Sequence, residues 1–482
     1  MFSGDIKSNY RYYFGNWCLL FTTRVVDLPL TKSGVESKEI LTIRDEEKPK
    51  VGRNGAIGGG DAHAINSDHP TSYLETITHL LRGNIGSGVF AMGDGFKNGG
   101  LFLAPVLTLF IGVVSVHSQH ILLKVSKRMR DKFGYETDPD FALTVELAFA
   151  SGPPMLRSWA RSMKIIVNIF ICVTQIGFCA IYFVFISSSL KQVFDYYGFE
   201  MNVQLVLAFT LVPMLIPSLI TNLKYLAPCS LIANFLMATG IGVVYYYACK
   251  DLPSVTERNY FPPNFQTLPL FFGTAIFAFE GIALVLPLKN SMKNPSNFSR
   301  PAGVLNMGMI FVTTLFITFG FVGYLCWGDD VAGSLTLNLP QDEILAQVVK
   351  VTVSLGMWLT FPLQFFVPIQ IMWPQINQRF GPFKNPLRYE LLFRTLMVLI
   401  TFTIAELVPR LNLFISLIGA LCATALALVF PPVIQLVSSF STSEGLGVLV
   451  ILKNCVILTI AILGFSTGTY ESISALAVAF FD

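Results

Sequence analysis

Charged residues are scarce in this sequence of 482 residues. Asp, Glu, Lys and Arg make up 13 % of the chain, against about 25 % in an average soluble protein. Hydrophobic residues make up 53 %, and the mean hydropathy is +0.60. So few charges do not cover the surface of a water-soluble protein, whereas a bilayer accepts apolar faces. The composition therefore excludes an ordinary soluble protein and predicts a membrane protein surrounded by lipid.

An excess of positive charge is also lacking. Lys and Arg number 33 and Asp and Glu number 30, which leaves a net charge of +3 at pH 7. Domains that bind nucleic acid usually carry a strongly basic surface. We therefore expect no nucleic-acid partner.

Sequence signatures of enzymes and metal sites are missing as well. No G-x-x-x-x-G-K-[ST] phosphate loop occurs, which argues against ATP-driven pumping. No histidine is followed by Glu, which excludes an H-E-x-x-H zinc site, and the eight cysteines include no C-x-x-C pair. One G-x-S-x-G occurs at Gly464 to Gly468, but no histidine follows it, as the hydrolase order requires. We expect neither an enzyme nor a bound cofactor or metal.

Long apolar segments recur from Thr71 onward. A transmembrane helix needs about 20 predominantly apolar residues, and Pro, Gly, Asn and charged residues separate segments of about this length. The sequence therefore predicts an all-α membrane protein. The eleven expected spans are 73–96, 99–123, 164–190, 203–221, 225–249, 268–288, 303–327, 343–372, 388–408, 412–437 and 447–467.

The first 70 residues differ from the rest because they are polar and rich in Gly and charge. This composition is typical of a flexible tail. The sequence predicts three units: a tail over 1–70, a transmembrane domain over 71–467 and a short tail over 468–482. The transmembrane domain is divided into a first half over about 71–249, a second half over about 268–437 and an extra helix over about 447–467.

The distribution of Lys and Arg predicts the orientation in the membrane, because cytoplasmic loops carry an excess of both. The loops after the second, sixth and eighth spans are rich in Lys and Arg, whereas the loop between the seventh and eighth spans carries only acidic charges. We therefore expect a cytoplasmic N-terminus. With an odd number of spans, the C-terminus is expected on the extracellular or luminal side.

The first span contains three glycines and an asparagine in its middle, between His79 and Gly88. Each Gly costs a helix about 1 kcal/mol relative to Ala, and a break in hydrocarbon survives only where it is buried in protein or lines a cavity. There the free N–H groups and the positive end of the following half-helix attract a carboxylate. Close packing of small residues between helices is the alternative, but these glycines do not keep its four-residue period. We therefore predict a break.

The sixth span carries an acidic residue in its middle, within Ala278-Phe279-Glu280-Gly281. A charge at this depth costs about 2.5–3.5 kcal/mol on insertion scales, so Glu280 is a functional candidate. Its structural alternative is a neutral, protonated Glu280 that hydrogen-bonds between helices. Breaks in the first helix of each of two five-helix halves are typical of inverted-repeat secondary transporters.

His79 lies one helical turn before Gly83 and is therefore expected directly under the first break. The reference pKa of imidazole is about 6.5, so this side chain can bind a proton in an acidic compartment and release it at neutral pH. That chemistry is required for proton symport. A structural hydrogen-bonding role explains a single membrane histidine about equally well.

Five stretches of the sequence match a known pattern in their content and order: Asp68 to Thr76 with His79 to Gly88, Phe178 to Phe185, Phe277 to Ile282, Thr336 to Pro340 and Phe361 to Phe365. They resemble the proton-coupled amino acid transporters, a branch of the amino acid/auxin permease family. The similarity runs from about residue 68 to 467. The sequence departs from the family at Gly93, where Pro is usual, at Asp94, which adds a charge, and at Lys289, where Glu is usual.

The resemblance implies an eleven-helix, LeuT-like fold, in which two inverted five-helix repeats with broken helices 1 and 6 are followed by one extra helix. It also implies symport of small neutral amino acids with protons, driven by the proton gradient, at the plasma membrane or the lysosomal or late endosomal membrane. By the same resemblance, His79 couples the proton and the two breaks face the substrate.

Our hypothesis assigns a role to each candidate residue. The substrate carboxylate is expected on N–H groups of Asn84, Ile85, Gly86, Ser87 and Gly88. The ammonium is expected near Phe279, Glu280 and Gly281, with the proton on His79 and with Tyr182 and Phe279 as aromatic gates. A rival interpretation is an amino acid sensor, which binds the same ligand, transports little of it and signals to cytoplasmic partners through the N-terminal tail.

Overall fold

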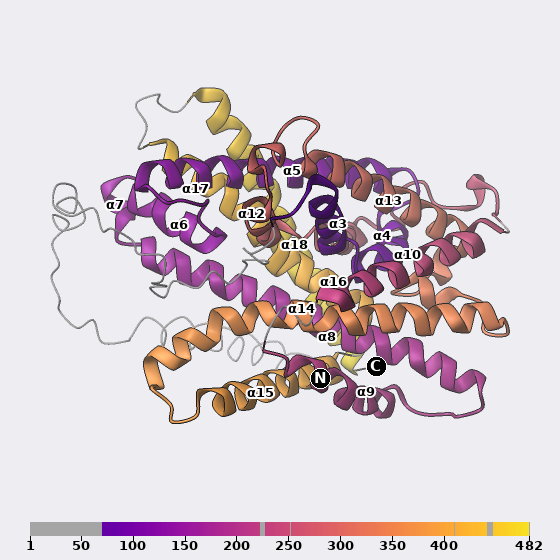
Figure 1. Cartoon of the computed structure of the whole chain (residues 1–482). Coiled ribbons are helices and arrows are strands. Elements are labelled where there is room, and N and C mark those ends of the chain that lie inside the picture. Colours follow the sequence, from indigo (N-terminus) through magenta and orange to yellow (C-terminus); the bar gives the residue numbers. More distant parts are fainter. Residues whose placement is uncertain (1–69, 222–226, 251, 409, 441–446, 482) are drawn as a thin grey trace, which may run out of the picture. The chain divides into compact units, whose positions relative to one another are not determined.

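The computed structural model describes residues 70–221, 227–250, 252–408, 410–440 and 447–481. Nearly all of the N-terminal segment that the sequence predicts as a tail lies outside the described residues. Within them the chain is almost entirely helical, with one isolated β-bridge between Thr71 and Met292 (Figure 1).

The α-helices in chain order are α3 (Tyr73–Asn84), α4 (Ser87–Gly99), α5 (Leu103–Phe133), α6 (Phe141–Ala150), α7 (Pro154–Arg157), α8 (Ala160–Tyr196), α9 (Val203–Ser218), α10 (Ala227–Lys250), α11 (Leu268–Ala278), α12 (Ile282–Ser291), α13 (Val304–Trp327), α14 (Ile344–Phe380), α15 (Pro386–Leu407), α16 (Leu411–Ile418), α17 (Phe430–Ser439) and α18 (Val448–Phe481). Two π-helical segments, η7 (Gly419–Ala423) and η8 (Ala425–Val429), join α16 to α17. Short 3₁₀ turns are η2 (Val255–Glu257), η3 (Phe265–Thr267), η4 (Pro295–Asn297), η5 (Gly328–Asp330) and η6 (Leu335–Asn338).

Every span expected from the sequence coincides with one helix or with a group of consecutive helices. In the described part of the chain, eight helical segments are long and apolar enough to cross a membrane. The first span is divided between α3 and α4, and α9 has only 16 residues. The all-α membrane fold is thus confirmed, while the count of eleven spans stays a prediction.

Two helical segments differ from the sequence-based boundaries. The last helix, α18, continues to Phe481 instead of ending near residue 467, so residues 468–481 are helical. No Gly or Pro follows Gly468, and the residues after it favour a continued helix. In addition, the loop expected after the second span contains the helix α6. The Asp140 side chain caps its N-terminus and accepts a hydrogen bond from the Leu143 N–H at 2.7 Å. Such a cap satisfies a free backbone donor of the first turn.

The start of α3 follows directly from local sequence. Ser72 and Glu75 form a capping box, in which the Ser72 N–H donates to the Glu75 carboxylate at 2.7 Å and the Ser72 hydroxyl accepts from the Glu75 N–H at 3.4 Å. This reciprocal arrangement satisfies two backbone donors that a helix start leaves free. The first helix therefore begins at Tyr73, as the sequence predicts.

The second half of the first span, α4, is almost entirely buried. Its residues from Ser87 to Phe96 are all buried, and it packs against α11 and α13. In the view of Figure 1, α3, α4 and α12 lie between the long helices α5 and α14. The longest helices, α8 and α14, pack directly against each other. This arrangement places both ends of the first break inside protein.

Candidate functional site

The first span is broken at Ile85 and Gly86. Helix α3 ends at Asn84 and α4 begins at Ser87. Ile85 is extended, with φ −93° and ψ 92°, and Gly86 has φ −137° and ψ −142°. No side chain caps the start of α4, so its first N–H groups lack the intrahelical partners that inner turns have. These N–H groups and the positive end of the helix dipole together form a site that can bind an anion.

The sixth span is broken in the same manner. Helix α11 ends at Ala278, α12 begins at Ile282, and Phe279, Glu280 and Gly281 lie between them. The Glu280 N–H still donates to the Phe277 carbonyl at 3.2 Å, which closes the last turn tightly. Both breaks predicted from the sequence are therefore present.

The two breaks lie against each other. A Cβ added at Gly88 would lie 2.8 Å from the Cα of Ala278, and one added at Gly281 would lie 2.9 Å from Oδ1 of Asn84. Real Cβ atoms do not approach backbone as closely as 2.8 Å, so Gly88 is required for the close approach of Ala278, and a side chain at Gly281 would displace the amide of Asn84. The glycines of one break thus allow direct contact with the other.

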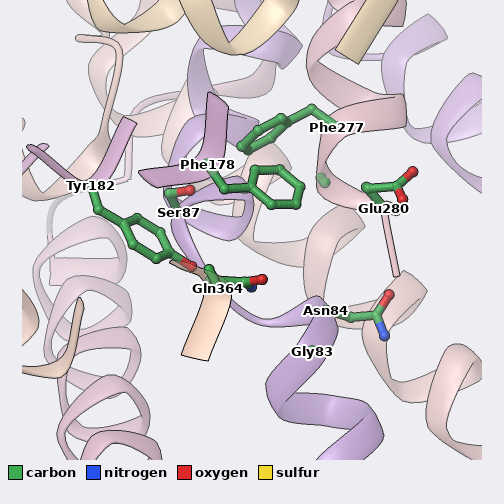
Figure 2. A pocket seen from close by; sticks show the side chains of 11 residues that line it. Gly83, Asn84, Ser87, Phe178, Tyr182, Phe277, Glu280 and Gln364 are labelled. Atoms are coloured by element: carbon green, nitrogen blue, oxygen red, sulfur yellow. The ribbon is translucent and has the colours of Figure 1, made fainter. Parts of the chain in front are cut away.

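A cavity opens where the two breaks meet (Figure 2). It is small: measured as room for the centre of a water molecule, its volume is about 20 Å³, and one water needs about 10–15 Å³ by that measure. In this conformation it holds only one or two water-sized groups. Its lining residues are Gly83, Asn84, Gly86, Ser87, Gly88, Phe178, Tyr182, Phe277, Ala278, Glu280 and Gln364.

One end of the cavity carries hydrogen-bond acceptors without partners. Asn84 Oδ1 and Glu280 Oε2 are buried and have no hydrogen-bond partner among the residues that the structure describes. The amide nitrogen of Asn84 is already used, because it donates to the Leu80 carbonyl at 2.9 Å. Both side chains lie at the same end of the cavity (Figure 2). Buried acceptors without donors are unfavourable, so this end suits a ligand that donates hydrogen bonds and carries positive charge.

The other end carries the start of α4 and two polar side chains. The Tyr182 hydroxyl lies close to Gly86, because a Cβ added there would be 3.5 Å from the hydroxyl oxygen. The side chains of Gln364 and Ser87 lie beside it (Figure 2). The N–H groups at the start of α4 and the hydroxyl are hydrogen-bond donors. This end therefore suits a carboxylate.

Two aromatic rings form the apolar wall between these ends. Phe178 of α8 and Phe277 of α11 pack edge to face, with 4.8 Å between ring centroids and an interplanar angle of 76°. Both line the cavity. A ligand that spans the polar ends would place its remaining atoms against these rings.

The sequence-based candidates divide into two groups. Asn84, Gly86, Ser87, Gly88, Tyr182 and Glu280 line the cavity. Ile85 and Gly281 belong to the breaks but do not line it, and His79 lies on α3 one turn from Gly83, partly exposed. Phe279 is directed elsewhere, because its ring packs against Phe316 of α13 at 5.1 Å.

Three important lining side chains were not among the candidates. Phe178 lies one helical turn before Tyr182, on the same face of α8, so the spacing could have indicated it. Phe277 was passed over in favour of Phe279, although residues two apart on a helix do not share a face. Gln364 is a polar residue in an apolar stretch of α14, and nothing local links it to residues almost 300 positions earlier.

The chain matches known transporter sequences over most of its length. The family model described as transmembrane amino acid transporter protein matches residues 69–474. The chain is 36 % identical over 429 residues to the proton-coupled amino acid transporter-like protein pathetic of Drosophila melanogaster, with 88 % of this chain and 90 % of the relative covered. It is 27 % identical over 443 residues to the probable amino acid transporter skat-1 of Caenorhabditis elegans, covering 87 % and 96 % of the two chains.

Solved structures show the same fold at low sequence identity. The inward-facing conformation of Mhp1 matches with a TM-score of 0.51 and 15 % identity, covering 85 % of this chain and 92 % of that one. Mhp1 in a closed conformation, described as a nucleobase-cation-symport-1 family transporter, matches with a TM-score of 0.50 and 14 % identity, covering 86 % and 95 %. The fold is thus the LeuT-like one that the resemblance implied. The chain belongs to the family of transmembrane amino acid transporter proteins and is a multi-pass membrane transporter, not an enzyme.

Proposed function

We propose that this transporter carries small neutral amino acids together with protons. One observation carries the proposal: the two helix breaks meet at a cavity that presents hydrogen-bond acceptors at one end and hydrogen-bond donors at the other. The unpaired acceptors Asn84 and Glu280 lie at one end, and the start of α4 with Tyr182 lies at the other. A zwitterion matches both ends at once. The name of the Drosophila relative, which refers to proton coupling, supports the same proposal.

Each charged group of the substrate has its own place in this proposal. The carboxylate accepts hydrogen bonds from the N–H groups of Ser87 and Gly88 and from the Tyr182 hydroxyl. The ammonium donates to Asn84 Oδ1 and to the Glu280 carboxylate. Ile85 and Gly281 contribute backbone conformation rather than contacts, and Phe279 supports the break by packing against α13.

Uptake by purified protein in liposomes tests this function. With the lumen neutral and the outside at mildly acidic pH, radiolabelled glycine or alanine should accumulate, and accumulation should collapse when a protonophore removes the gradient. A panel of acidic, basic and large neutral amino acids should be carried poorly. Specific binding without accumulation would instead indicate the sensor interpretation, and neither binding nor accumulation would contradict the proposal.

His79 is the proposed coupling residue. It lies on α3 one turn from the cavity-lining Gly83, on the same helix face, and its charged neighbours on that helix are Arg82 and Glu75. An imidazole can exchange a proton between the two compartments at physiological pH. We expect His79→Ala to abolish acid-stimulated uptake while exchange of substrate at equal pH persists. Full acid stimulation in His79→Ala, measured as the ratio of initial rates at acidic and neutral pH, would remove this role.

The aromatic wall should limit the size of the substrate. Phe178→Ala removes one ring of the edge-to-face pair and enlarges the cavity, so uptake of leucine or methionine relative to glycine should rise about tenfold or more, since burying a large apolar side chain contributes about 1.5–3 kcal/mol. The measurement is initial uptake rate over a series of increasing side chains. Phe170→Ala is the matched control, because that ring lies on the same helix and packs edge to face with Phe430, outside the cavity lining. An equal change in both variants would show that the pair does not select for size.

A further inference from the structure

One half of each broken span, α3 in the first and α12 in the sixth, is joined to the other at one end of the bundle. The Thr71 N–H donates to the Ser291 carbonyl at 2.8 Å, and the Lys293 N–H donates to the Thr71 carbonyl at 3.0 Å. The two hydroxyls of Thr71 and Ser291 are 3.3 Å apart. The start of α3 is therefore paired by backbone with the end of α12.

The same two helices are also packed together near the cavity. A Cβ added at Gly83 would lie 2.5 Å from Cδ1 of Leu284, which places α3 directly on α12 at the level of the breaks. The two short helices are thus in contact at both ends, through Thr71 with Ser291 and through Gly83 with Leu284. Together, α3 and α12 form the α3–α12 unit.

A buried ion pair ties this unit to the segment between α5 and α6. Lys289 of α12 donates to the Asp138 carboxylate, and their side chains are only 7 % and 2 % exposed. The neighbouring Asn290 amide donates to the Asp138 carbonyl at 2.7 Å. The ammonium of Lys289 and the amide of Asn290 thus both contact Asp138, which belongs to a different segment.

The segment that carries Asp138 is itself held firmly. The carbonyl of Pro139 accepts hydrogen bonds from Ser126 of α5 at 2.8 Å and from Thr144 of α6 at 3.1 Å. Arg130 lies on the other side of Asp138, with Nη1 at 2.9 Å from Oδ1, and also pairs with the exposed Asp131. Asp138 is therefore fixed to α5 and α6, whereas Lys289 belongs to the α3–α12 unit.

We propose that the Lys289–Asp138 ion pair is a latch that keeps the cavity closed at the end of the bundle where α3 begins. This inference rests on the proposed transport function, because only a transporter must open that end. Residues of the α3–α12 unit reach the cavity through Gly83 and Asn84, and a path to this end requires the unit to separate from α5 and α6. That separation breaks the ion pair. Asp138 keeps Arg130 as a partner, whereas the Lys289 ammonium loses its carboxylate. A charge that loses its partner is unfavourable, so the latch biases the protein toward the closed arrangement.

Thiol accessibility of the cavity tests the latch without any substrate. Ser87, which lines the cavity, is replaced by Cys in a variant in which the exposed Cys249 and Cys455 are Ser. A small membrane-impermeant thiol reagent is then applied to sealed vesicles from the side on which α3 begins. Lys289→Met and Asp138→Asn should each raise the rate of Ser87→Cys modification about tenfold or more. The double variant should add little to either single change, because both remove the same contact.

Two variants serve as matched controls. Lys289→Arg retains the charge, and Lys293→Met removes an exposed charge from the same end of α12; both should be modified at the parental rate. Modification within twofold of the parental rate in both latch variants, or an equal rise in Lys293→Met, would overturn the proposal. Failure of the wild-type protein to carry any amino acid would contradict the proposed function instead, and it would leave this measurement unchanged.

A milder variant covers the case in which the latch variants do not fold. Asn290→Ala retains both charges of the latch and removes only the hydrogen bond from the Asn290 amide to the Asp138 carbonyl. It should raise the rate of Ser87→Cys modification about fivefold, since a hydrogen bond contributes about 1 kcal/mol. Modification of the Asn290→Ala variant at the parental rate would overturn the latch.

Discussion

Glu280→Gln is expected to raise the substrate KM about 100-fold, with a smaller effect on the maximal rate. Glu280 Oε2 is buried beside the cavity and has no hydrogen-bond partner among the described residues, so it is available for the ammonium. Removing one member of a buried charge pair costs about 2–5 kcal/mol, and every 1.4 kcal/mol corresponds to about tenfold in affinity. The substitution keeps the shape of the side chain, so the fold should be retained. Uptake measured over a wide concentration range gives both constants.

A control separates the local effect from a general change of charge. Glu257→Gln removes a carboxylate from an exposed turn in η2 and should leave KM unchanged. If Glu280→Gln kept the parental KM, the ammonium would not bind at this carboxylate. The structural alternative, a neutral Glu280 that only supports the break, would then be favoured, and a lower thermal stability of Glu280→Gln would be its signature.

Arg394→Leu is expected to lower the free energy of unfolding by about 3–5 kcal/mol, the usual cost of leaving a buried charge without its partner. The Arg394 side chain is 1 % exposed, and its Nε and Nη2 donate to Glu390 at 2.9 and 2.8 Å. Its Nη1 donates to the Ser218 and Ile220 carbonyls, both at 3.2 Å. Ser218 is the last residue of α9 and Ile220 lies two residues beyond it, where helix ends leave carbonyl groups unsatisfied. Thermal unfolding in detergent measures the loss.

The same helix provides a matched control for this substitution. Arg388 of α15 is exposed, so Arg388→Leu should change the unfolding temperature little, because surface substitutions usually change stability by no more than about 0.5 kcal/mol. Equal unfolding temperatures for the two variants would show that the buried arginine is not a stabilising anchor. The arginine also lies over the ring of Phe366 in α14, 5.6 Å from its centroid, two residues beyond the cavity-lining Gln364.

The helix breaks could be predicted because their causes lie within a few residues of sequence. Gly86 and Gly88 lower helix propensity where hydrocarbon otherwise favours an unbroken helix, and Gly281 does the same in the sixth span. Glu280 marks the same place by the cost of a charge in the middle of the membrane. The start of α3 was equally local, since the capping box of Ser72 and Glu75 needs only four consecutive residues. In each case the backbone responds to its immediate neighbours.

The directions of the side chains around the breaks could not be predicted from local sequence. Phe277 and Phe279 are both aromatic residues beside the break, yet only Phe277 lines the cavity, while Phe279 packs against Phe316. Their order in the sequence does not indicate which face of α11 meets the cavity. That choice depends on where α13 and α8 pack.

By itself, the sequence determined that the chain is an all-α membrane protein, where its two helices break, and that Asn84, Ser87 and Glu280 are candidates for ligand contact. Only the tertiary structure decided that Phe178, Phe277 and Gln364 complete the cavity, and that Lys289 meets Asp138 about 150 residues away. The physical reason is the range of the forces involved. Helix propensity, capping and the cost of buried charge act along the chain, whereas a cavity wall or a buried ion pair exists only after distant helices have packed together.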